Sequence, residues 1–135
     1  MYKIEKRPSG YLLTFSGTID ATEMQRWQIE SKTKLALETS KSFGVIIDMR
    51  DLQPLSKDAS KIMIEGQKPY KQTGMKKSAV ILNNAEICTQ FKNLALQSGI
   101  FTTEKYIDGS KHGQKAIEMA INWVKGRSIC IFVFF

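Results

Sequence analysis

A short, uninterrupted apolar run constrains the fold of this chain more than any other feature. It reads Phe43-Gly-Val-Ile-Ile-Asp48 and ends in a carboxylate. A strand with one face in water alternates apolar and polar residues, whereas a strand covered on both faces is apolar throughout, as in parallel sheets. The run therefore predicts a central strand of a parallel sheet that is covered by helices.

Two β-prone runs precede the central strand. Residues 2–7 and 10–17 are separated by Pro8-Ser9-Gly10, which is typical of a turn, so we expect a hairpin. Asp20 then stands where a helix N-cap is favoured, because its carboxylate can accept a hydrogen bond from a free helix N–H. The helix should extend to about Ser40.

After the central strand, we expect a loop from Met49 to Leu55 and then a helix. The apolar positions between Ala59 and Tyr70 keep helical spacing, with Ser56 or Asp58 as the cap. Pro69 should bend or end this helix, because proline lacks the backbone N–H and clashes with the preceding turn.

The rest of the chain repeats the alternation of strands and helices. Ser78–Leu82 predicts a buried strand, and a helix should run from Asn83-Asn84 to Ser98-Gly99. Residues 102–107 predict a more polar edge strand, and residues 110–125 a last helix.

The resulting order is β-β-α-β-α-β-α-β-α. Its alternation requires right-handed crossovers, which predicts an α/β fold with a single mixed, mostly parallel five-stranded sheet whose first strand is antiparallel. A chain of 135 residues suits one domain, which we assign to residues 1–126, followed by an apolar tail, 127–135.

The element order resembles that of STAS-like (sporulation anti-anti-sigma-factor-like) domains, from Tyr2 to about Lys125. The segments that carry the resemblance are Gly44-Val-Ile-Ile-Asp48, Gly74-Met-Lys-Lys-Ser-Ala-Val80 and Ala120-Ile-Asn-Trp123. More narrowly, the chain is similar to uncharacterised bacterial STAS-like proteins that are also compared with lipid-binding CRAL-TRIO domains. For that group the resemblance implies no enzymatic activity.

In anti-anti-sigma factors of this fold, a serine in an Asp-Ser-x-Gly loop after the central strand is phosphorylated, and the modification switches partner binding. The corresponding positions here fall near Ser56-Lys57, so a lysine stands at the phosphoacceptor position and no glycine follows. The usual motif is therefore missing. Ser56 is either a helix cap or a modification site beside the expected one.

Polar residues follow the expected strands, where α/β folds place ligands. Helix capping explains those that stand just before a helix, which are Asp20, Asn83 or Asn84, and Asp108. Capping does not explain Asp48, Arg50 and Asp51, which either form a local ion pair or belong to a binding surface. Together with Ser56, these three residues are the candidate partner-binding site.

Catalytic and metal-binding patterns are missing from the sequence. The one histidine, His112, has no nucleophile motif beside it, and Gly109-Ser-Lys-His-Gly113-Gln-Lys115 departs from the spacing of a phosphate-binding loop. Cys88 and Cys130 have no metal-ligand spacing and are expected to be free thiols. We therefore expect no enzyme, no catalytic residue, no metal and no cofactor.

The net charge of +7 comes mostly from lysines spread along the chain, with few aromatic residues between them. This distribution favours a solvated surface over a nucleic-acid interface. No apolar stretch is long enough for a transmembrane segment and no signal peptide is apparent, so we expect a cytoplasmic protein.

Two functional hypotheses follow. The first is a non-catalytic protein-interaction or regulatory module that binds a protein partner through the Asp48–Ser56 loop and the next helix. The second, motivated by the CRAL-TRIO comparison, is a carrier or sensor of a small apolar, lipid-like ligand held between sheet and helices. Met24, Met63 and Met119 could line that site, although core packing also explains them.

The tail, 127–135, is expected either to pack on the domain, to touch a membrane or to form a homodimer seam.

Overall fold

The computed structural model describes residues 1–126 of the chain. Its strands are β1 (Tyr2–Arg7), β2 (Gly10–Gly17), β3 (Phe43–Leu52), β4 (Met75–Leu82) and β5 (Glu104–Asp108). Its helices are α1 (Ala21–Ala36), α2 (Lys57–Thr73), α3 (Ala85–Ser98), the 3-10 turn η1 (Phe101–Thr103), α4 (Gly109–His112) and α5 (Lys115–Val124).

The strands form one sheet in the order β1-β2-β3-β4-β5, which places β3 at the centre. β1 is antiparallel to β2, and each later strand is parallel to the one before it. The predicted α/β class and the mixed, mostly parallel five-stranded sheet are therefore confirmed.

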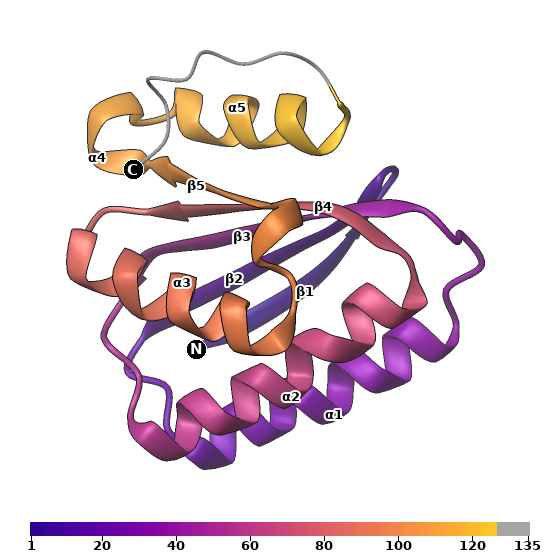
Figure 1. Ribbon diagram of the computed structural model, residues 1–135, viewed down its shortest axis with the longest axis horizontal. Helices are drawn as coiled ribbons and strands as arrows, with labels where there is room; N and C mark the ends of the chain where they lie inside the picture. The colour runs from indigo at the N-terminus through magenta and orange to yellow at the C-terminus, as the bar shows by residue number, and fades with distance from the viewer. Residues whose placement is uncertain (127–135) are drawn as a thin grey trace.

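Helices cover the sheet on two sides. Because the parallel strands step in one direction, right-handed crossovers place α1, α2 and α3 on the same face, while α4 and α5 lie on the other (Figure 1). A larger core fills the space under α1–α3, and a smaller core of mostly Ile and Ala side chains lies under α5.

Trp27 on α1 anchors the larger core. Its ring stacks on Tyr70 of α2 at 6.1 Å between centroids and meets Phe15 of β2 edge-on at 5.4 Å. Gly66 of α2 lies directly against the indole, because a Cβ there would come within 2.1 Å of Trp27 Cζ3. The close contact of α1 with α2 thus depends on a glycine facing a tryptophan.

The first helix ends earlier than the sequence predicts, at Ala36 rather than near Ser40. Two residues after that end, the Glu38 carboxylate accepts hydrogen bonds from the Tyr11 hydroxyl, the Lys6 ammonium and the Ser40 backbone N–H. These contacts tie the chain to the hairpin and turn it away from the helix axis.

The central strand is longer than predicted, since it reaches Leu52 and includes more than half of the expected 49–55 loop. The register against β2 changes from Thr14 opposite Asp48 to Ser16 opposite Asp51, so one extra residue is accommodated in a β-bulge. The bulge lets β3 keep its pairing with β2 beyond the apolar run.

Pro69 lies inside α2, so of the two expected effects, a bend or an end of the helix, it does not end the helix. The carbonyl of Glu65 loses its helical donor there, but Glu65 is exposed, so water can replace the missing hydrogen bond. Tyr70, the next residue, is buried and shares a 2.7 Å hydrogen bond with Ser31 of α1, which holds the helix in place.

The predicted last helix is split into α4 and α5 at Gly113, whose φ of +52° lies in the left-handed region. β5 is an edge strand as predicted, but its polar side chains are less exposed to solvent than the prediction of a polar edge strand implies. Glu104 and Asp108 on β5 are both buried.

No helix within residues 1–126 combines the length and apolar character that crossing a membrane requires. The predicted apolar tail, 127–135, and Cys130 within it lie outside the described residues.

Candidate functional site at the carboxyl end of the sheet

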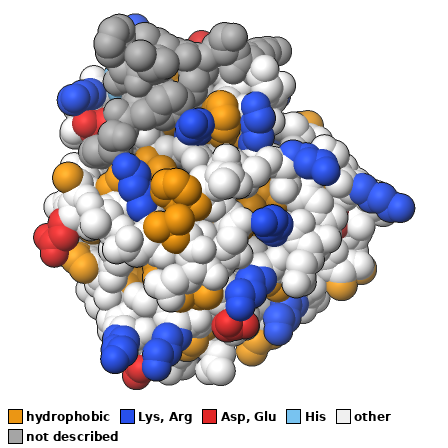
Figure 2. Space-filling model, viewed as in Figure 1, with side chains coloured by type: hydrophobic (Ala, Val, Ile, Leu, Met, Phe, Trp, Pro, Cys, Tyr) orange, Lys and Arg blue, Asp and Glu red, His pale blue; other side chains and the backbone are white. Residues whose placement is uncertain are grey.

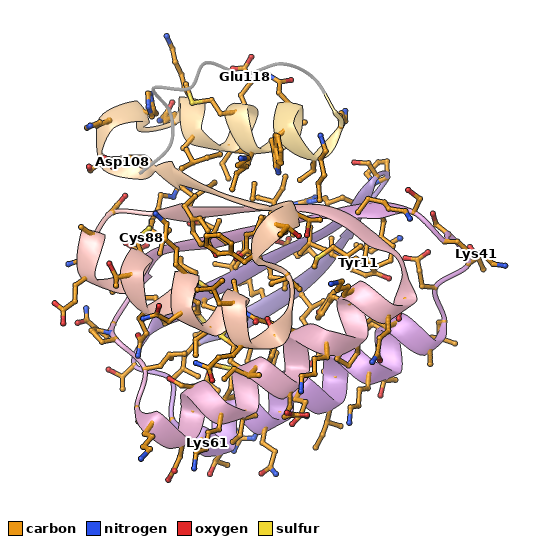
Figure 3. All side chains as sticks on the ribbon, in the orientation of Figure 1. Tyr11, Lys41, Lys61, Cys88, Asp108 and Glu118 are labelled. Carbon is orange, nitrogen blue, oxygen red and sulfur yellow. The ribbon has the colours of Figure 1, made fainter. Side chains whose placement is uncertain are left out.

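Four polar residues at or beyond the strand ends serve as helix N-caps. Their side-chain oxygens accept hydrogen bonds from N–H groups of the first helical turn, as capping requires. The pairs are Asp20 with Glu23 at 2.8 Å, Ser56 with Ala59 at 3.2 Å, Asn84 with Glu86 at 2.8 Å, and Asp108 with Ser110 at 2.9 Å. Figure 3 shows the labelled Asp108 at the start of α4.

Asp48 and Arg50 form an ion pair at the end of β3. The guanidinium donates from Nη2 and Nε to the two carboxylate oxygens at 2.8 and 2.9 Å, and these hydrogen bonds raise the pKa of Arg50 above its ordinary value. The side chains are 18% and 28% exposed, so the pair is partly shielded from water.

The ion pair supports the start of α4. A Cβ on Gly109 would lie 3.0 Å from Arg50 Cδ and 2.6 Å from Asn83 Oδ1, so the three residues are closely packed. Of the two sequence interpretations of Asp48 and Arg50, the structure shows the local ion pair.

The segment between β3 and α2, residues 53–56, is fixed to the domain from two sides. The Gln53 N–H donates to the Gly17 carbonyl at 3.0 Å. Leu55 is buried, its N–H donates to Gln90 Oε1 at 3.1 Å, and its carbonyl accepts from Gln90 Nε2 at 2.9 Å. Gln53, Pro54 and Ser56 remain exposed. Their side chains therefore point to solvent from a backbone that these hydrogen bonds fix in place.

Four charged residues surround this segment. Asp51 and Lys57 are exposed beside it, and Asp58 and Lys61 are exposed on the first turns of α2, where Figure 3 shows the labelled Lys61 pointing away from the body. Elsewhere on the face seen in Figure 2, Lys and Arg side chains are scattered rather than gathered in one patch.

Of the four predicted partner-binding residues, the structure therefore brings Asp48 and Arg50 together and leaves Asp51 and Ser56 facing solvent. Gln90, which fixes the segment, was not singled out from the sequence. It lies 35 residues from Leu55, and an isolated glutamine on a helix carries no signal of such a contact.

The three methionines considered as ligand lining do not meet in one cavity. Met24 and Met63 are buried in the larger core, whereas Met119 packs against the smaller core on the opposite side of the sheet. Beside Met63, the described core leaves a cavity of about 20 Å³, lined also by Gln67 and Tyr70. That volume suits about one water molecule, not a lipid-sized ligand.

Two buried titratable groups lie on β5 and α3. Burial raises the pKa of Glu104 to about 7, while Ser78 Oγ and Tyr106 Oη each donate to it at 2.7 Å. Burial also raises the pKa of the Cys88 thiol, which favours its protonated, unreactive form. Among residues 1–126, no group of three or more His, Cys, Asp and Glu side chains is arranged to hold a metal ion.

Comparison with protein-family models gives no match, and comparison with curated proteins gives no significant match.

Proposed function

We propose that this chain is a non-catalytic protein-interaction module of the STAS-like type, which contacts its partner through residues 51–57 and the first turn of α2. The observation that carries the proposal is the double hydrogen bond between Gln90 and Leu55. It holds an exposed segment in one conformation without using any of the segment's outward side chains.

A segment ordered before binding loses less conformational entropy when a partner associates, so more of the contact energy appears as affinity. Binding residues are also often found on loops that a rigid scaffold positions. Asp51 and Lys57 would supply charged contacts around the segment, and Gln53 and Pro54 would supply its centre.

The proposal does not require phosphorylation. Ser56 already accepts the Ala59 N–H as the cap of α2, which gives this serine a structural role without modification. A module of this kind would bind its partner constitutively, or its binding would be regulated by a signal received elsewhere on the domain.

Site-specific photo-crosslinking tests the proposal. A photoreactive residue at Gln53, introduced into the full chain in its own host, should crosslink to one defined protein. The same residue at Lys32, which is exposed on α1, should not. Equal yields at the two positions, or crosslinking at Lys32 alone, would contradict the proposed surface.

A further inference from the structure

A groove lies on the α5 side of the sheet, away from the segment discussed above. α5 packs mainly on β3, β4 and β5, and makes little contact with the neighbouring part of β2 beside it. The groove has a volume of about 410 Å³ and runs between α5 and the β1–β2 hairpin. Figure 1 shows the hairpin turn and the end of α5 on the same side of the molecule.

The floor and one wall of the groove are apolar. Leu12 on β2 lies opposite Ile46 on the adjacent β3, and Ile117 and Ile121 face them from α5. Leu12, Ile117 and Ile121 are only partly buried, although each is a large aliphatic side chain. Contiguous aliphatic surface that a domain leaves open is typical of a binding site.

The groove is basic at one end. Arg7 and Lys125 both line it, and none of the described residues that line it is acidic. This end lies over the start of β3, because Val124 packs against Gly44 there. The Lys125 ammonium makes no ion pair with any described residue, whereas Arg7 is 3.5 Å from Glu5.

Away from Arg7 and Lys125, the described residues that line the groove are uncharged, and most of them are apolar. The groove thus has a cationic end, and the rest of its lining is largely aliphatic.

We propose that this groove binds an apolar monocarboxylate, with its carboxylate beside Arg7 and Lys125 and its aliphatic chain along Leu12, Ile46 and Ile121. The volume falls within the range of small-molecule sites, which combine an apolar lining with a few charged groups that fix orientation. The inference goes beyond the proposed protein interaction, since it concerns another surface and another kind of ligand.

Methyl-detected NMR of the full chain, titrated with decanoate below its micelle concentration, tests this inference. Saturable shifts should appear at Leu12, Ile46, Ile117 and Ile121, and not at Ile47, which lies in the larger core on the other face of β3. Decanol should bind more weakly, and decyltrimethylammonium more weakly still. The absence of shifts, shifts centred on Ile47, or equal binding of the cationic probe would overturn the inference.

Two variants sharpen the test. Lys125→Glu places a negative charge at the basic end and should weaken decanoate binding by about fivefold or more, while leaving decanol binding unchanged. Leu12→Trp should block both probes by filling the groove. Lys32→Glu, on the far face of the domain, is the charge-matched control and should bind decanoate like the unaltered chain. Equal decanoate affinity in Lys125→Glu and Lys32→Glu would contradict the proposed orientation.

Discussion

The side-chain amide of Gln90 on α3 forms two hydrogen bonds with the backbone of Leu55, at 3.1 and 2.9 Å, and so replaces the strand or helix partners that Leu55 lacks. Leu55 is buried, so loss of the amide would leave two of its backbone groups without partners.

We therefore predict that Gln90→Leu lowers the free energy of unfolding by about 2 kcal/mol. It should also accelerate hydrogen exchange at the Leu55 amide more than at the Ala59 amide, which Ser56 holds. Gln90→Glu, which keeps an acceptor but loses the donor, should have an intermediate effect. Unchanged exchange at Leu55 in Gln90→Leu would show that the segment is held in another way.

The contact of Gly66 with Trp27 gives a packing prediction. Gly66→Ala should destabilise the domain by about 2 kcal/mol or more, although alanine is the better helix former, because its Cβ overlaps the indole ring. In a Trp27→Leu background the same change should cost much less, since the overlapping atoms are gone. Chemical denaturation of the four proteins measures the coupling, and additive effects would contradict the packing argument.

Glu38 should make the domain sensitive to acid. Hydrogen bonds from Lys6 and Tyr11 lower its pKa from the ordinary value of 4.5 to about 2. Its contribution to stability is therefore present above pH 4.5 and is lost as the pH falls towards 2. Glu38→Gln should cost about 1 to 2 kcal/mol at pH 7 and progressively less below pH 4.5, as followed by urea denaturation. A constant difference across this range would contradict the assignment.

Glu104 should affect the pH dependence of stability in the opposite direction from Glu38, and at higher pH. Because burial raises its pKa from 4.5 to about 7, the folded state favours the neutral carboxyl, whose contribution is full below pH 4.5 and is lost as the pH rises through 7. Glu104→Gln mimics the neutral form and should increase the free energy of unfolding at pH 8 by about 2 kcal/mol, with little change at pH 4.5. Lower stability of the variant at pH 8 would contradict this account.

The sequence was most informative where the structure depends on neighbouring residues. The apolar run ending at Asp48 predicted the central strand, and Asp20 predicted the start of α1, because capping and burial patterns act over a few residues. The element order then determined the parallel topology through the handedness of its crossovers.

The features that the sequence did not predict depend on contacts between distant residues. The end of α1 depends on Glu38 reaching Tyr11, and the order of the segment before α2 depends on Gln90 reaching Leu55. The extension of β3 depends on a bulge against β2. The groove beside α5 arises from which strands the last helix leaves uncovered, which the periodicity of that helix does not specify.

The affinity of the crosslinked partner for purified variants tests the central claim most directly. Asp51→Arg combined with Lys57→Glu reverses two exposed charges beside the held segment. Because the Asp51 carboxylate also attracts Arg50, a thermal melt of the double variant first checks that the fold is unaffected. By isothermal titration calorimetry, this double variant should bind the partner at least about tenfold more weakly than the unaltered chain. The control Lys32→Glu should bind normally. Equal affinity of the double variant and the unaltered chain would contradict the claim that residues 51–57 form the interface.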